Sequence, residues 1–410
     1  MHDIKSLKPV IEEQLSKDPA DVSIIKLVDL LVEYAYAAGA SDIHIEPTKD
    51  ELRIRYRIDG LLYDVFKDPK AKMEIHPEVI SRIKVLSGLR TDEHLLPQDG
   101  RFRVRIEDTA DVDVRVSIIP TYYGENVIMR VLARMQSFDL ATFGFPPEDL
   151  QKIKKAIAKP YGMILANGPT GSGKTTLLYA IMKQINRPDT SIITIEDPIE
   201  YSLDGTTQIQ TNSDVGLTFA NGLRSILRQD PNIIMVGEIR DEETASISVN
   251  AALTGHLLLS TLHTNDAATT FPRLLDMGVP SFLVASTVNV AVSQRLVRRL
   301  CENCKKQHVL SEEEVKSLAE LFPNLSPGTA FYGPGGCPQC NNTGYQSRIA
   351  IHEVLEVDDT IRKLVMSRAS AQDIRQAAIA SGMRTIAEDG LTAAEKGLTS
   401  IEEILRVVQE

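Results

Sequence analysis

Eight consecutive residues near the middle of the chain restrict its fold more than any other stretch. They match the pattern G-x-x-x-x-G-K-[S/T] at every position: Gly168, Pro169, Thr170, Gly171, Ser172, Gly173, Lys174 and Thr175. The apolar run 162–167 predicts a buried strand before them, and 176–185 predicts a helix after them. A glycine-rich loop between a strand and a helix is the context in which this octet binds phosphate. The other interpretation, an ordinary glycine-rich turn, does not explain a complete octet in this context.

The chemistry of this loop follows from its residue types. The glycines let the backbone curl so that its N–H groups point at phosphate oxygens, and the helix N-terminus adds a partial positive charge. We expect Lys174 to reach the β- and γ-phosphates of a nucleotide and the Thr175 hydroxyl to bind Mg²⁺. The predicted nucleotide-binding set continues to Thr176, in the first turn of the helix.

The composition of the chain excludes several classes of protein. The net charge of −11 over 410 residues argues against a general nucleic-acid binder, although it leaves room for a local basic channel. No run of about 18 apolar residues predicts a membrane span, and the N-terminus lacks the pattern of an export signal. We therefore expect a cytoplasmic protein.

Changes in pattern along the chain predict its domains. Residues 21–135 combine helices with alternating strands, which indicates an α+β domain with a largely antiparallel sheet. From about residue 150, strands alternate with helices, which predicts an α/β domain with a parallel sheet covered on both faces. The predicted segments are an N-terminal arm at 1–20, the α+β domain at 21–135, a linker at 136–149, the α/β domain at 150–300, a cysteine module at 301–350 and a helical region at 351–410.

Three apolar runs after the octet are followed by residues whose side chains suit catalysis at a phosphate group. Glu196 and Glu238 each follow a predicted strand, and His263 follows a third. The carboxyl ends of parallel strands share one edge of the sheet, where ligands bind, so we expect these side chains near the octet. A carboxylate there would orient or deprotonate the attacking water, and His263 would sense the γ-phosphate.

The sequence does not divide the roles between the two acids. Gly237 occupies the position where such enzymes usually carry aspartate, and the acid is displaced by one residue to Glu238. Either Glu196 or Glu238 could be the base, and either could hold Mg²⁺ through a water molecule.

The four cysteines form two C-x-x-C pairs: Cys301, Cys304, Cys337 and Cys340. Each pair on a tight turn would supply two corners of a tetrahedron, so the set predicts a structural zinc site. Four thiolates leave no open position for a catalytic water. The other interpretation is a set of unrelated buried thiols.

Together these motifs resemble the secretion ATPases of the type II secretion and type IV pilus assembly family. Besides the octet, the matching stretches are GASDIHIEP (39–47), RYRIDG (55–60), LPQDGR (96–101), EDP (196–198), LRQDP (227–231), GEIRD (237–241) and STLHTN (260–265). The resemblance implies a PAS-like N-terminal lobe and a RecA-like ATPase lobe with nucleotide between them. It also implies a homo-hexamer whose N-terminal lobe supplies Arg115 and Arg130 as phosphate-contacting, catalytic residues. Arg228 and Arg240, in the α/β domain, are weaker candidates for phosphate contacts.

The resemblance further implies an ATPase motor that uses ATP and Mg²⁺ to drive pilus assembly or protein secretion. The zinc module favours the assembly and secretion branch over pilus retraction motors. We expect an inner-membrane platform protein as partner, peripheral association with the inner membrane through it, and no nucleic acid. The family's N-terminal docking domain is absent from this sequence, which indicates truncation or docking through another surface. The rival hypotheses are a RecA-like nucleic-acid translocase and a nucleotide-gated assembly factor with little turnover.

Overall fold

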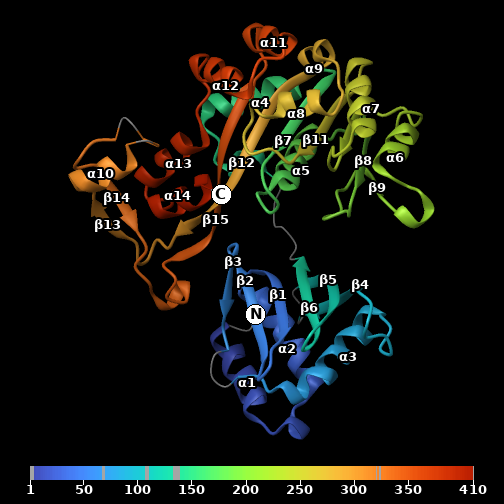
Figure 1. The fold of residues 1–410 in the computed structure, drawn as a ribbon, viewed down its shortest axis with the longest axis vertical. Helices are drawn as coiled ribbons and strands as arrows, with labels where there is room; N and C mark the ends of the chain where they lie inside the picture. Colours follow the sequence, from blue (N-terminus) through green and yellow to red (C-terminus); the bar gives the residue numbers. More distant parts are fainter. Residues whose placement is uncertain are drawn as a thin grey trace. The chain divides into compact units, whose positions relative to one another are not determined.

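The computed structural model describes residues 4–66, 70–106, 110–132, 139–319, 321–322 and 325–409. The chain forms two compact units, Met1–Gln136 and Ser137–Glu410 (Figure 1). None of the helices in these ranges has the length and apolar character that are needed to cross a membrane.

The N-terminal unit is an antiparallel sheet of six strands in the order β3-β2-β1-β6-β5-β4. Its strands are β1 (Ala40–Pro47), β2 (Leu52–Ile58), β3 (Leu61–Asp64), β4 (Gln98–Ile106), β5 (Ala110–Thr121) and β6 (Gly124–Leu132). Its α-helices are α1 (Ile4–Ser16), α2 (Ile24–Ala37) and α3 (His76–Ser87). Apolar side chains of the helices and of one sheet face form a single core, as the alternating strands predict.

The first helix of this unit differs from the prediction of a loosely held arm over 1–20. Residues of α1 at spacings of four, Leu7, Ile11 and Leu15, are buried in the core of the unit. Pro9 and the polar composition suggested a loose segment, but Pro9 lies inside the helix. A stripe at i, i+4 and i+8 is enough to attach a mostly polar helix to a core.

The second unit is built on a seven-stranded sheet in the order β15-β12-β7-β11-β10-β8-β9. The strands are β7 (Gly162–Asn167), β8 (Ile192–Glu196), β9 (Thr207–Gln210), β10 (Ile233–Val236), β11 (Leu257–Leu262), β12 (Val288–Leu300) and β15 (Tyr345–Glu356). All neighbouring pairs are parallel except β12 and β15, which are antiparallel.

Helices cover both faces of this sheet (Figure 1). Met163 and Leu165 of β7 belong to one apolar cluster, whereas Ile164 and Ala166 belong to another on the opposite face. The helices of this region are α4 (Pro147–Ile157), α5 (Lys174–Ile185), α6 (Phe219–Ile226), α7 (Glu242–Leu253), α8 (Thr270–Asp276) and α9 (Ser281–Thr287). The burial of all six residues of β7 agrees with a strand that is covered on two sides.

The C-terminal part of the chain joins the same sheet. β13 (Lys306–Val309) and β14 (Ala330–Gly333) form a small antiparallel sheet, and α10 (Glu312–Leu318) lies between them in the sequence. β15 then returns to pair with β12. Because β15 begins at Tyr345, it crosses the boundary that we expected at residue 350. The remaining helices are α11 (Asp359–Met366), α12 (Ala371–Ala380), α13 (Ile386–Glu395) and α14 (Ile401–Gln409).

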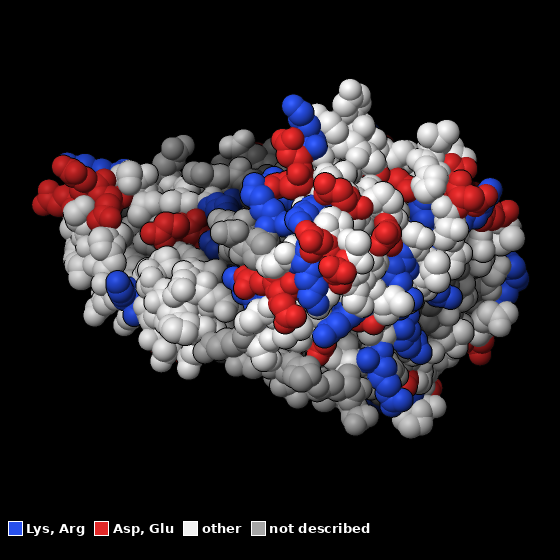
Figure 2. Space-filling model, turned by 90° about the horizontal axis from the view of Figure 1, so that it is seen from below, with Lys and Arg blue, Asp and Glu red and all other residues white. Residues whose placement is uncertain are grey.

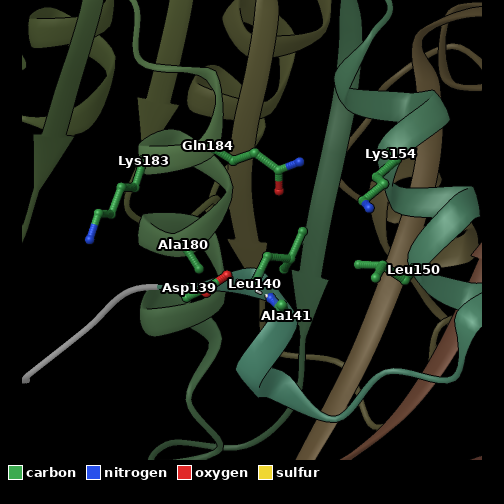
Figure 3. A pocket seen from close by; sticks show the side chains of 8 residues that line it. All are labelled: Asp139, Leu140, Ala141, Leu150, Lys154, Ala180, Lys183 and Gln184. Atoms are coloured by element: carbon green, nitrogen blue, oxygen red, sulfur yellow. Dashed lines mark hydrogen bonds between the residues drawn. The ribbon is translucent and has the colours of Figure 1, made fainter.

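A pocket of about 370 Å³ lies where α4 and α5 meet the short helix Leu140–Phe143 (Figure 3). Lys183 and Gln184 of α5 and Lys154 of α4 line it. These α5 residues are about 14 Å along the helix axis from Lys174, at a rise of 1.5 Å per residue. The pocket is therefore separate from the phosphate-loop end of α5.

Candidate active site

The octet forms a tight loop between β7 and α5, in the order that its pattern predicts. Gly168, Gly171 and Gly173 have φ values of 140°, 80° and 85°, which favour glycine. Lys174 begins α5 and donates from Nζ to the carbonyl oxygens of Gly168 at 2.7 Å and Pro169 at 2.9 Å. The loop therefore curls around the ammonium group.

Burial lowers the pKa of Lys174 to about 8. The Glu238 carboxylate opposes this shift, and the Arg295 guanidinium adds to it. An oxyanion next to this ammonium would favour its charged form, so Lys174 is suited to bind phosphate.

Two hydroxyl groups complete the loop. Ser172 Oγ is buried, and it has no hydrogen-bond partner within the part of the chain that the structure describes. Thr175 is half-buried in the first turn of α5, together with Thr176. A buried hydroxyl without a partner agrees with a loop that is shaped to receive a polar ligand.

Glu238 and His263 come together at the carboxyl ends of β10 and β11. His263 Nε2 lies 3.1 Å from Glu238 Oε2, and Arg240 Nε lies 2.6 Å from the same oxygen. The backbone is fixed there because Thr261 Oγ1 donates to the Gly237 carbonyl at 2.7 Å. Glu238 follows β10, and the phosphate loop follows β7. These two strands are separated by β11, so their axes lie about 10 Å apart.

Glu196 has a different environment. Its Oε1 accepts hydrogen bonds from Thr194 Oγ1 at 2.7 Å and Gln208 Nε2 at 3.1 Å. The Tyr179 hydroxyl donates a hydrogen bond to Oε2. The side chain is buried at the end of β8, which is three strands, or about 14 Å, from β7. Of the two acids, Glu238 is the one whose negative charge raises the pKa of Lys174.

Two residues that the sequence reasoning missed lie against the loop. Gln294 Nε2 donates to the Ser172 carbonyl at 2.7 Å, and Arg295 Nη2 donates to the Asn265 carbonyl at 3.0 Å. Both lie on β12 and are almost fully buried. The only signal in the sequence was a polar pair in the first part of this strand, where apolar residues alternate with Asn289 and Ser293.

Arg115 and Arg130, the predicted phosphate contacts of the other lobe, lie on β5 and β6 of the N-terminal unit. Arg130 Nε is 3.1 Å from Asp42 Oδ1, and Arg57 Nε is 3.5 Å from the other oxygen of that carboxylate. Figure 2 shows a face of the molecule on which basic and acidic side chains are interspersed. A contact between these arginines and phosphate stays a prediction.

The four cysteines form one cluster. Their Sγ atoms lie within 4.8 Å of one another, and three Sγ–Sγ distances are 3.7 to 3.8 Å. A zinc ion bound tetrahedrally at about 2.3 Å to each sulfur requires sulfurs about 3.8 Å apart. The N–H groups of Gly336 and Gly344 donate to the sulfurs of Cys304 and Cys340. The residues therefore fit zinc.

The parallel sheet, the loop around a buried lysine and the carboxylate on a nearby strand end define a P-loop nucleoside triphosphatase. A family described as Type II/IV secretion system protein matches residues 17–406. The chain belongs to this family, and it is an ATPase that uses ATP with Mg²⁺.

Two curated relatives show the extent of the similarity. The Type IV pilus assembly ATPase PilB of Myxococcus xanthus is 45% identical over 380 residues, which are 92% of this chain and 67% of that protein. The Type II secretion system protein E of Xanthomonas campestris pv. campestris is 46% identical over 401 residues, which are 97% of this chain and 70% of that protein. The predicted family is therefore confirmed.

Solved structures agree on the fold. The ATPase DotB of Legionella pneumophila has a TM-score of 0.70 at 22% identity and covers 96% of this chain and 98% of its own. The pilus retraction motor PilT with bound ADP has a TM-score of 0.62 at 24% identity and covers 92% and 96%. Both are similar in fold, and the predicted α/β class is confirmed.

Proposed function

We propose that this ATPase is the hexameric motor of a type IV pilus assembly or type II secretion machine. The relatives named for these two machines match almost the whole chain at 45–46% identity. The observation that carries the catalytic part of the proposal is the arrangement of Lys174, at the start of α5, with Glu238 and His263, which follow the neighbouring strands β10 and β11. As a cytoplasmic protein, the motor would associate with the inner membrane through a platform protein.

The roles of the residues follow from their surroundings. Lys174 and the backbone N–H groups of the loop hold the β- and γ-phosphates, and Glu238 orients the attacking water and accepts its proton. His263 and Arg240 keep the Glu238 carboxylate in position, since both contact the same oxygen. Thr175 would hold Mg²⁺, which neutralises charge on the phosphates.

The second part of the proposal concerns the N-terminal unit. Arg115 and Arg130 would contact the phosphates when the two units close on ATP, and they would leave when hydrolysis lets the units open. Two arginines would stabilise the charge that develops on the transferred phosphoryl group. Repeated closure in a ring of six subunits would move the platform protein.

The test measures phosphate release from the purified full chain with ATP and Mg²⁺. We expect Lys174→Ala to abolish turnover, while Lys183→Ala on the exposed side of the same helix leaves it unchanged. Turnover retained by Lys174→Ala would refute the assignment of the loop. Strong stimulation by DNA or RNA would favour a nucleic-acid translocase, and co-purification with a pilus or secretion platform protein would identify the machine.

A further inference from the structure

We propose that Gln294 is a positioning residue that orients the phosphate-binding backbone of the octet. The inference rests on the proposed function, because it assigns a role at the same nucleotide site. Gln294 lies on β12, the neighbour of β7, and 1% of its surface is exposed. Its amide Nε2 donates to the Ser172 carbonyl oxygen at 2.7 Å.

The consequence of this bond follows from the planarity of the peptide group. In a trans peptide, the C=O and the N–H of the next residue point in opposite directions. By holding the Ser172 carbonyl toward β12, Gln294 turns the Gly173 N–H away from β12. That N–H is one of the donors that a phosphate loop offers to its ligand. The glutamine would thus fix a phosphate-binding N–H before nucleotide arrives, which reduces the ordering cost of binding.

The loop glycines adjoin the same residue closely. A Cβ added to Gly173 would lie 2.6 Å from Gln294 Nε2, and one added to Gly168 would lie 2.6 Å from the Gln294 carbonyl oxygen. The contact with the Gln294 backbone leaves no room for a side chain at Gly168, whereas a side chain at Gly173 would displace the Gln294 amide; the φ values of both positions favour glycine as well. β12 is therefore the wall against which the loop takes its shape.

The same strand also reaches the segment that follows His263. Arg295 Nη2 donates to the Asn265 carbonyl at 3.0 Å, two residues after His263. Adjacent residues of β12 thus hold the phosphate loop and the histidine segment against one strand. A shift of β12 at this point would move both parts of the site.

A matched contact on the same strand separates positioning from general stability. Asn289 of β12 is buried, and its Nδ2 donates to the Tyr161 carbonyl at 3.0 Å, just before β7 begins. An added Cβ on Gly162 would lie 2.2 Å from this amide nitrogen. Both contacts join a buried amide on β12 to a carbonyl of the segment that contains β7, but only the Gln294 contact holds the octet.

Gln294 also suits a substitution that preserves the fold. Its Oε1 is buried and has no hydrogen-bond partner among the described residues. Methionine has a similar shape and removes this unpaired acceptor together with the donor, which offsets part of the cost of leaving the Ser172 carbonyl oxygen without its donor. If Gln294 contributed only to stability, its substitution would not combine a small loss of stability with a large loss of nucleotide affinity.

The experiment compares Gln294→Met with the control Asn289→Leu in the full chain. We expect Gln294→Met to raise the Kd of ADP with Mg²⁺ about tenfold, the effect of losing one oriented hydrogen bond, and to raise the KM for ATP more than it lowers kcat. Asn289→Leu should change the Kd less than about threefold, although it lowers the melting temperature at least as much. The Kd is measured by titration calorimetry.

Equal effects of both variants on the Kd would overturn the inference. If Gln294→Met fails to fold, Gln294→Glu provides the second test. Its ionised carboxylate cannot donate, so the Kd should rise more than tenfold at pH 8 and recover toward the wild-type value at pH 6. A Kd ratio that does not change with pH would then reject the role of the donor. If the wild-type chain neither binds ADP nor hydrolyses ATP, the proposed function itself fails.

Discussion

Arg115 on β5 lies directly opposite Arg130 on β6. Directly opposed residues of an antiparallel pair extend from the same face, so the two guanidinium groups share a surface. The row continues through five strands and contains Arg57, Asp42, Arg130, Arg115 and Arg101. Like charges in direct opposition cost stability, and Asp42 is the single acid of the row. An arrangement with this cost agrees with a surface that binds an anion.

The first prediction separates binding from folding at Arg115. We expect Arg115→Gln to lower kcat for ATP at least about a hundredfold, because the transition state loses a charge-stabilising donor. The melting temperature of the variant is measured alongside kcat, so that a loss of catalysis is distinguished from a loss of folded protein.

The control for this prediction is Arg53→Gln on β2. Arg53 pairs with Asp64 and lies outside the row, so its replacement should leave kcat unchanged. If Arg115→Gln and Arg53→Gln have the same steady-state kcat, Arg115 does not act on the phosphates.

The second prediction divides the roles of the two acids. Glu238→Gln should lower kcat by about 10²- to 10⁴-fold while ATP still binds, because the base is lost and the loop is intact. Glu196→Gln should lower kcat less and cost about 1–3 kcal/mol of stability, because the new amide donor faces the donors Tyr179, Thr194 and Gln208.

Single-turnover hydrolysis and thermal unfolding of both variants provide the measurement. A greater loss of kcat in Glu196→Gln than in Glu238→Gln would reverse the assignment. Tyr179→Phe serves as the control, since it removes one of the donors to Glu196 and keeps the carboxylate.

The local parts of the fold could be predicted from the sequence. Periodicity describes local structure well, because local structure depends on residues that are neighbours in the sequence. It predicted the strand 162–167, the loop after it and the strand-end positions of Glu196, Glu238 and His263. The antiparallel N-terminal sheet was predicted from strands in which polar and apolar residues alternate. The parallel second sheet was predicted from strands that alternate with helices along the chain.

The missed features depend on residues that are distant in the sequence. β12 and β15 pair across the intervening cysteine module, and no local pattern shows that Tyr345 onward returns to the main sheet. Gln294 contacts Ser172 from 122 positions away, so its role was visible only in the structure. The helix α1 was missed because three apolar residues among polar ones gave a weak signal.

The third prediction concerns the four cysteines. Elemental analysis of the chain purified without chelator should find about one zinc ion per chain, and Cys340→Ser should reduce this content strongly. Asn303→Ser is the control: its Nδ2 lies 3.7 Å from Cys337 Sγ, but it is not one of the four ligands. Zinc content that is absent from the wild type, or unchanged in Cys340→Ser, would contradict the site.

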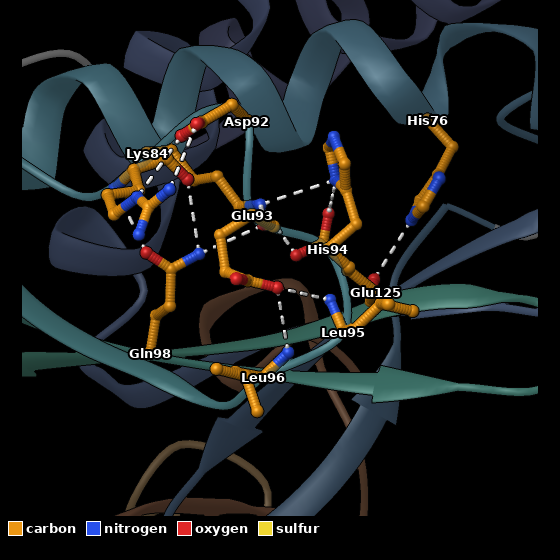
Figure 4. A network of polar contacts seen from close by, with 10 residues as sticks. His76, Lys84, Asp92, Glu93, His94, Leu95, Leu96, Gln98 and Glu125 are labelled. Carbon is orange, nitrogen blue, oxygen red and sulfur yellow. Dashed lines mark hydrogen bonds and ion pairs between the residues drawn. The ribbon is translucent and has the colours of Figure 1, made fainter.

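The last prediction uses a buried ion pair in the N-terminal unit (Figure 4). Lys84 is fully buried and its Nζ lies 2.6 Å from Glu125 Oε1, while His94 Nδ1 lies 2.7 Å from Glu125 Oε2. Burial alone would raise the pKa of the Glu125 carboxyl, but Lys84 and His94 together hold it below the ordinary value of 4.5. The pair therefore stabilises the folded unit above that value, and the stabilisation is lost as the pH falls through the lowered pKa.

Glu125→Gln should accordingly destabilise the N-terminal unit by about 3 kcal/mol at pH 7, because a buried ammonium loses its anion. The difference from the wild type should shrink as the pH is lowered from about 5 to about 3, where the wild-type carboxylate itself becomes protonated. Hydrogen exchange of α3 and β6, corrected for the intrinsic dependence on pH, measures this difference. Glu78→Gln removes an exposed carboxylate from the first turn of α3, so it should change the exchange of α3 by less than about 1 kcal/mol at any pH. A difference that stays constant with pH would mean that Glu125 contributes through packing and that its charge is not what stabilises the unit.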